Sequence, residues 1–154
     1  MPRSGARPGP PAQPPIGQLL HRVAGTVSRA FDEALLAEGG SRSTWLVLLA
    51  LTIDSGANQR QLARFVGIRG ATLSHHLDTM EAAGLVVRQR DPGNRRSHLV
   101  RRTPAGDELF ARLREAATAF DRRLRRGLSR AEVDELRRLL GVLATNCSSE
   151  RSQR

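Results

Sequence analysis

The most chemically informative side chains of this sequence lie between positions 69 and 78. Leu73, Leu77 and Met80 follow one another at steps of four and three, which predicts a helix with one buried stripe. The other flank of this helix is small or polar, so it can enter the major groove of DNA, which is about 12 Å wide. Hydroxyl, imidazole and guanidinium groups on that flank can bond to base edges and phosphates. The candidate DNA contacts are Arg69, Gly70, Ala71, Thr72, Ser74 and His75.

A second group of candidates is cationic and falls in residues 88–102, where six arginines stand beside a single acid, Asp91. The Asp-Pro-Gly-Asn segment that begins at Asp91 has the composition of a turn, and apolar residues on both sides predict a hairpin over residues 85–103. The tip of this hairpin would carry Arg95 or Arg96 over the adjacent minor groove. The negative potential there is strongest when the groove is narrow.

Periodicity and capping residues predict the elements that position these side chains. Apolar residues at three- and four-residue steps predict a long helix from residue 16 to about residue 39. Ser41 or Ser43 can cap a second helix, and Asn58 can cap a short third helix over residues 59–65. The second and third helices therefore each have a start signal in the sequence.

The short third helix and the helix over residues 69–83 are separated by Gly67. We expect Leu62 and Phe65 of the third helix to face inward. Two short helices joined by a glycine-containing turn and followed by a hairpin make a winged helix-turn-helix.

Two further helices are predicted after the hairpin. Thr103 as N-cap and Pro104 at the first helical position start one of them, and Ser129 with Glu132 forms a capping box before the other. The predicted fold class is thus mainly α with a small β-hairpin wing.

The charge balance indicates a polyanionic partner. The 154 residues carry 25 arginines, no lysine and a net charge of +10. Residues 58–103 alone hold nine arginines against three acids, so the positive charge is concentrated around the predicted winged helix-turn-helix. We therefore expect double-stranded DNA as the partner.

Several other classes are excluded by the composition. Apolar runs fall short of the ~18–20 residues of a membrane-spanning helix, and we expect a cytoplasmic chain. Neither a phosphate-binding glycine loop nor a nucleophile elbow occurs, so we expect no enzyme and no cofactor. His75 and His76 project about 100° apart on a helix and do not converge on a metal ion. Cys147 is the only cysteine, which excludes an internal disulfide.

Residues 46–106 resemble the MarR family of bacterial transcriptional regulators, and the helix order on either side also fits. The segments that carry the resemblance are QLA at 61–63, GIRGATLSHHL at 67–77, MEAAGLV at 80–86, RDPGNRRS at 90–97, LV at 99–100 and RTPAG at 102–106. The wing segment at 90–97 is the most specific of them.

The resemblance implies a homodimer whose winged lobes bind an inverted-repeat operator. It places Thr72–His75 in the base-reading part of the recognition helix, makes Asp91 the wing acid that braces an arginine, and makes Arg95 and Arg96 the wing-tip pair. The resemblance implies one domain at 16–146, with dimerisation helices at 16–38 and 104–146 and the winged helix-turn-helix lobe at 41–103. Composition predicts a flexible tail on either side, Pro/Gly-rich at 1–15 and polar at 147–154.

The family's effector pocket lies between the dimerisation and DNA-binding lobes. By this resemblance His21, Trp45 and Phe110 are candidates for the wall of a pocket for an aromatic or amphipathic small molecule. The chain departs from the family pattern at Asn94, where members often carry an acid, and at His75, where they often carry a basic residue. The departure at Asn94 predicts a weaker bracing of the wing. The departure at His75 predicts a different operator preference, or one that depends on pH through this imidazole.

Three functional hypotheses follow. The first is a sequence-specific transcriptional regulator, a dimeric repressor on an inverted-repeat operator that a small-molecule effector releases. The alternatives are a non-specific architectural DNA-binding protein and a small-molecule-binding protein whose basic surface is incidental. Comparing the affinity for operator and random DNA at matched salt separates the first from the second.

Overall fold

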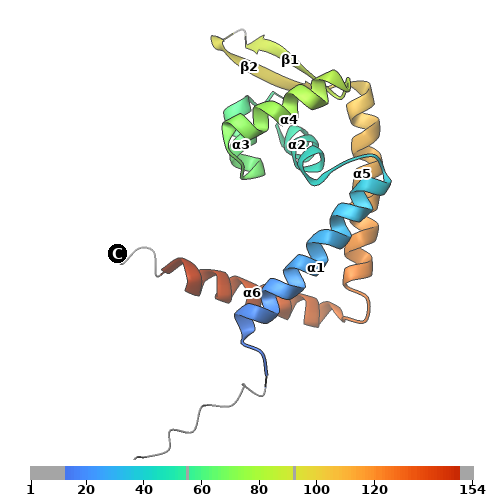
Figure 1. Ribbon diagram of the computed structural model, residues 1–154, viewed down its shortest axis with the longest axis vertical. Helices are drawn as coiled ribbons and strands as arrows, with labels where there is room; N and C mark the ends of the chain where they lie inside the picture. The colour runs from blue at the N-terminus through green and yellow to red at the C-terminus, as the bar shows by residue number, and fades with distance from the viewer. Residues whose placement is uncertain (1–12, 55, 92, 150–154) are drawn as a thin grey trace, which may run out of the picture. The chain divides into compact units, whose positions relative to one another are not determined.

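The computed structural model describes residues 13–54, 56–91 and 93–149, without the side chains of residues 94–97 and 149, and this part of the chain forms six helices and one hairpin (Figure 1). In chain order the elements are α1 (Ile16–Ala37), α2 (Arg42–Ile53), α3 (Gln59–Val66), α4 (Gly70–Ala82), β1 (Val86–Asp91), β2 (Asn94–Arg102), α5 (Pro104–Leu124) and α6 (Arg130–Ser149). The predicted fold class, mainly helical with a small hairpin wing, is confirmed.

The chain divides within α5 into two compact units, which we call the first unit (residues 1–117) and the second unit (residues 118–154). Of the tail predicted at 1–15, residues 1–12 lie outside the described part of the chain. α1 begins directly after Pro15, where the tail was predicted to end.

Capping side chains start α2 and α3 in the first unit. Ser41, rather than Ser43, is the N-cap of α2, because its hydroxyl accepts a hydrogen bond from the Thr44 amide at 3.1 Å. Asn58 and Gln61 form a capping box at α3, with N–O distances of 3.0 and 2.7 Å. Gly67 ends α3 with a φ of 73°, a left-handed conformation that a glycine adopts without strain.

The core of the first unit consists of aliphatic side chains from all of its elements. α4 contributes the predicted stripe of Leu73, Leu77 and Met80. The prediction that Phe65 faces inward is wrong, since this residue is 46% exposed. The buried stripe of α3 is centred on Leu62, Ala63 and Val66, and the helical period turns Phe65 out of it.

The hairpin is antiparallel, with Val86 opposite Arg102 and Arg88 opposite Val100, and its register shifts after Arg90. Val86 and Val100 are buried, so the face they share packs against the protein. Arg88 and Arg102 stand on this same inner face. Figure 1 shows the hairpin alongside α4, with which β1 makes contact.

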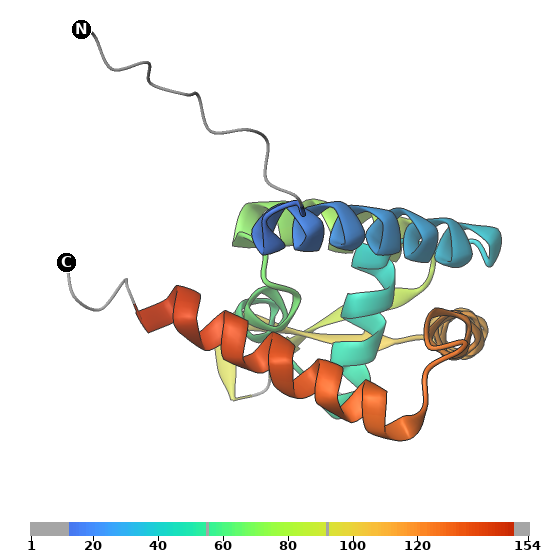
Figure 2. The same ribbon diagram turned by 90° about the horizontal axis from the view of Figure 1, so that it is seen from below.

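The second unit contains the end of α5 and α6. The predicted capping box is present, since the Glu132 carboxylate accepts from the Ser129 amide at 2.7 Å and the Ser129 hydroxyl accepts from the Glu132 amide at 3.3 Å. α6 continues unbroken through Ser149 (Figure 2), three residues past the predicted domain end at 146. Neither glycine nor proline follows Gly141 in this polar end, so no helix-breaking residue ends the helix earlier. The Ser148 hydroxyl donates to the Ala144 carbonyl within it.

Candidate nucleic-acid interface

The exposed flank of α4 is the centre of the candidate interface. Its buried stripe faces the core, and the side chains on the other flank are exposed at Ala71, Thr72 and His75. Arg69 is exposed at the N-cap, where it does not cap the helix with its own side chain. The fold therefore brings the predicted contacts of residues 69–75 to one helix end.

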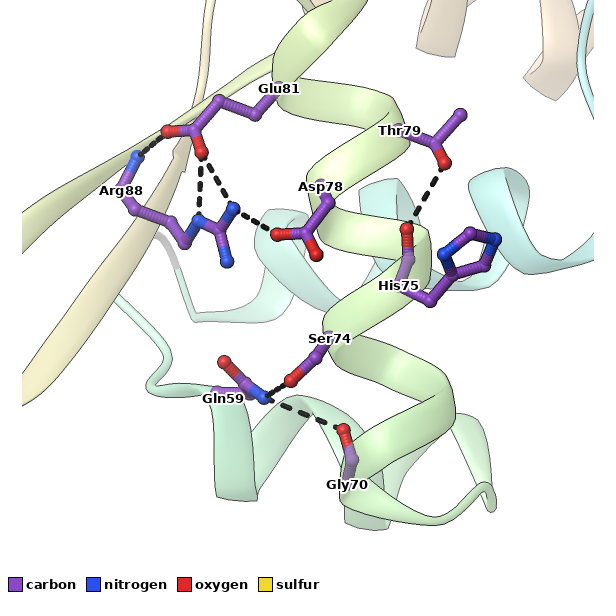
Figure 3. Close-up of polar contacts among 8 residues, drawn as sticks. All are labelled: Gln59, Gly70, Ser74, His75, Asp78, Thr79, Glu81 and Arg88. Atoms are coloured by element: carbon purple, nitrogen blue, oxygen red, sulfur yellow. Dashed lines mark hydrogen bonds and ion pairs between the residues drawn. The ribbon is translucent and has the colours of Figure 1, made fainter.

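Ser74 differs from the other candidates because it is half-buried and bonded to α3. The Gln59 amide donates to the Ser74 hydroxyl and also to the Gly70 carbonyl at 3.4 Å (Figure 3). Sequence reasoning did not single out Gln59. This side chain fixes the start of α4 against the start of α3, so Ser74 links the two helices as well as being a candidate DNA contact.

His75 lies on the side of α4 away from Arg88, with its backbone carbonyl accepting from the Thr79 hydroxyl at 3.0 Å (Figure 3). This hydrogen bond uses only the backbone carbonyl of His75, and the residue itself is exposed, so its imidazole is accessible. An exposed imidazole on a recognition helix can donate to or accept from a base edge.

An open groove of about 560 Å³ adjoins the N-terminal end of α4. Arg60 and Arg64 line it from α3, one helical turn apart and both exposed. These two residues were counted in the charge of the segment but were not proposed as contacts. Their spacing of four residues was the available signal, because it places both guanidinium groups on one face of a helix.

The wing is described only in part. Arg95 and Arg96 belong to β2, but their side chains lie outside the described part of the structure. The Asp91 carboxylate accepts from the Gly93 amide at 2.8 Å and so holds the turn. That Asp91 also braces an arginine stays a prediction.

Arg88 connects the wing to α4. Its amide donates to one Glu81 oxygen at 3.0 Å, its Nε donates to the other at 2.8 Å, and its Nη2 donates to Asp78 (Figure 3). The hydrogen bond from the Arg88 side chain holds the pKa of Glu81 below its usual value. The same two acids raise the pKa of Arg88, with Asp78 the larger influence.

Arg102 has a corresponding position at the base of the wing. Its Nε lies 2.9 Å from the Asp107 carboxylate, its Nη1 donates to the Thr52 hydroxyl at 2.9 Å, and its guanidinium lies 4.9 Å from the centre of the Phe110 ring. These partners lie on α5 and α2, so Arg102 ties three elements together.

The start of α5 packs tightly against the turn between α4 and β1. The Thr103 hydroxyl donates to the Gly84 carbonyl at 2.6 Å and accepts from the Gly106 amide at 3.1 Å. A Cβ on Gly106 would overlap the carbonyl oxygen of Leu85, so only glycine permits this approach. The end of α4 is thereby joined to α5.

Of the candidate effector residues, the structure brings two together. The rings of Trp45 and Phe110 are stacked, with centroids 5.4 Å apart and an interplanar angle of 18°. His21 is exposed on α1, and among the described residues no hydrogen bond or ring contact joins it to them. The pocket itself stays a prediction.

No group of three histidine, cysteine or acidic residues is placed to hold a metal ion within residues 13–54, 56–91 and 93–149. Within the same residues, no helix is long and apolar enough to cross a membrane.

Known proteins resemble this chain in sequence and in fold. A model of the MarR family matches residues 39–97. A crystal structure of a MarR family transcription regulator, 22% identical, superimposes with a TM-score of 0.83 over 90% of this chain and 92% of its own, which is a likeness of fold. The transcriptional repressor CouR bound to a 23-mer DNA duplex is 32% identical, with a TM-score of 0.76 over 84% of this chain and 92% of its own. CouR from Rhodococcus jostii RHA1 bound to p-coumaroyl-CoA is 34% identical, with a TM-score of 0.69 over 84% of this chain and 91% of its own.

Proposed function

The chain belongs to the MarR family of DNA-binding transcriptional regulators, and from this premise we propose that it is a dimeric repressor that recognises a specific operator. The observation that carries the proposal is the exposed flank of α4, which lies beside exposed arginines on α3. The arginines would bind phosphates with release of counterions, and the side chains of Thr72 and His75 would read base edges in the major groove.

Dimerisation is supported by apolar side chains that the chain leaves exposed. On α6, Leu136, Leu139 and Leu140 are 43–47% exposed, and on α1 Ile16 and Val23 are also exposed. A second copy could cover such stripes about a two-fold axis. The operator would then be an inverted repeat, with half-sites about one helical turn (~10 bp) apart.

Release by a small molecule is the regulatory part of the proposal. The relative CouR has been crystallised with p-coumaroyl-CoA, which contains an aromatic ring. In this chain Trp45 and Phe110 stack at the junction of α2 and α5, a place where a planar ligand could compete for aromatic contact. Such a ligand would release DNA by binding better to a dimer whose recognition helices have the wrong spacing.

The experiment that tests the proposal is a fluorescence-anisotropy titration. The intergenic DNA next to the protein's own gene is compared with a scrambled duplex at several salt concentrations. We expect tight, salt-sensitive binding to the intergenic DNA alone. Equal binding to both duplexes would favour the architectural DNA-binding protein, and binding to neither would favour the small-molecule-binding protein.

Two substitutions sharpen this experiment. Arg96→Ala should lower operator affinity. His75→Ala should change the discrimination between bases at one operator position by about 1–3 kcal/mol. Arg137→Ala is the matched control, since it removes one positive charge from α6, where Arg137 pairs with Asp134. An unchanged affinity for Arg96→Ala would contradict the assigned role of the wing.

A further inference from the structure

The inner face of the wing contains arginines as well as valines. Alternation along the strands places Val86, Arg88 and Val100 on the face that packs against the protein. Burying a guanidinium is costly unless it pairs with acidic groups or stays in contact with water. The side chain of Arg88 is only 25% exposed, so it needs acidic partners. Its partners are Asp78 and Glu81.

We propose that Arg88 is a positioning residue that fixes the wing to the recognition helix and makes no phosphate contact of its own. This inference rests on the proposed DNA-binding function and divides the arginines of the basic segment into two classes. Arg88 acts within the protein, whereas exposed arginines of the same hairpin, such as Arg90 and Arg101, are available to DNA.

The geometry of Arg88 is that of a two-point attachment. Its backbone amide and its Nε bond to the two oxygens of Glu81, at 3.0 and 2.8 Å, while Nη2 also lies 2.7 Å from Glu81 and bonds to Asp78. Strand backbone and side chain are thus both held by one residue of α4. The planar guanidinium suits this arrangement, and a lysine could not reproduce it.

The electrostatics favour the same role. Asp78 and Glu81 are three residues apart on α4, so their like charges are neighbours on the helix surface. Asp78 borders the exposed flank, with its side chain 60% exposed, and would repel phosphates if it were unpaired. Arg88 offsets both acids, and the lowered pKa of Glu81 and raised pKa of Arg88 agree with that pairing.

Arg90 provides the contrast. It lies two residues further along β1, is exposed, and has no ion pair with a described acidic residue. Removing either arginine changes the net charge by the same amount. The two substitutions Arg88→Gln and Arg90→Gln are therefore a matched pair that differs only in what the guanidinium contacts.

The salt dependence of operator binding distinguishes the two roles. Arg88→Gln should lower affinity about tenfold at every salt concentration, with the slope of log K against log salt unchanged. Arg90→Gln should make the slope shallower by about 0.9, as expected for one lost phosphate contact. A loss of about 0.9 in the slope for Arg88→Gln would overturn the proposal.

Amide hydrogen exchange on the free protein tests the attachment without DNA. Arg88→Gln and Glu81→Gln should both speed exchange of the β1 and β2 amides, while the amides of α2 remain protected. Arg88→Lys keeps the positive charge and should still loosen the wing, because charge alone does not reproduce the two-point attachment. This variant also serves as the test if Arg88→Gln folds poorly. Wing exchange that stays at the wild-type rate in Arg88→Lys and Glu81→Gln would overturn the proposal.

These outcomes are separable from failure of the proposed function. If the wild-type protein bound intergenic and scrambled DNA equally, the operator-specific function would fail. The exchange measurement would still decide whether Arg88 fixes the wing to α4.

Discussion

The two units of this protein use leucine in opposite ways. In the first unit Leu62, Leu73 and Leu77 are fully buried, and helices, wing and loops share one core. In the second unit Leu136, Leu139 and Leu140 of α6 remain nearly half exposed. Burying one such side chain stabilises a fold by about 1.5–3 kcal/mol. The first unit therefore gains its stability within one chain, whereas α6 needs an additional surface to gain as much.

The ion pairs show the same contrast. In the second unit they join neighbours on one helix, as in Arg125–Asp121, Arg137–Asp134 and Arg138–Glu135. In the first unit they join different elements, as Arg88 and Arg102 do. Pairs between exposed side chains of neighbouring turns contribute little to stability, because water and salt screen them. Pairs between elements also determine where those elements lie, and the candidate nucleic-acid interface depends on them.

The largest expected effect comes from placing charges on the exposed leucines of α6, which tests whether these leucines need a second copy to cover them. Leu136→Asp combined with Leu140→Asp places charges on the exposed stripe, so the dimer should dissociate and operator affinity should fall about 100-fold or more. Analytical ultracentrifugation and anisotropy measure the two effects. The control, Arg137→Asp with Arg138→Asp, changes charge on the same helix at polar positions. A dimer that survives the leucine substitutions would show that α6 is not its interface.

A smaller effect on the free energy of unfolding is expected from substituting one glycine in each unit. Gly106→Ala should lower the free energy of unfolding by about 1–3 kcal/mol, because the new methyl group meets the Leu85 carbonyl. Gly141→Ala on α6 meets nothing within 4 Å and should raise it by about 0.5–1 kcal/mol through helix propensity. Urea denaturation measures both. Equal stability of Gly106→Ala and wild type would contradict the tight packing at the start of α5.

The smallest effect concerns pH. The pKa of Glu81 is held below its ordinary value of 4.5 by the Arg88 hydrogen bonds, so this carboxylate stabilises the fold above that pH. The contribution is lost as the pH falls through the lowered pKa. With its side chain 38% exposed, we expect less than about 1 kcal/mol. Thermal unfolding of wild type and Arg88→Gln should therefore converge at acidic pH, and a difference that grows there would contradict the sign.

Much of the fold was predictable because its signals are local. Asn58 with Gln61 and Ser129 with Glu132 each cap a helix within four residues of chain, and Gly67 and Gly84 end helices through their own backbone conformation. The stripe of Leu73, Leu77 and Met80 likewise needed only the helical period. Phe65 was mispredicted because α3 has only eight residues and one fully buried leucine, Leu62. The buried stripe through Leu62 can continue at either of two adjacent rotational positions on so short a helix, and only one of them includes Phe65.

The candidate site was predictable only in part. Exposure of residues 69–75 follows from the period of α4, and so it was available from sequence. The link between Gln59 and Ser74 was not, because it joins side chains from two helices whose packing the sequence does not specify. Arg60 and Arg64 had a usable signal in their spacing, but their position beside α4 required the fold.

The sequence by itself determined the helices, the hairpin and the concentration of arginine between residues 58 and 103, because each depends on residues close together in the chain. Only the tertiary structure decided what individual arginines contact. Arg101 and Arg102 are neighbours of the same type, yet Arg102 bonds to Thr52 and Asp107 while Arg101 is exposed. Two features decide which arginine is held: the register of β1 against β2, and the packing of the hairpin on α2, α3 and α4. Such selection depends on contacts between residues far apart in sequence, which composition and periodicity do not encode.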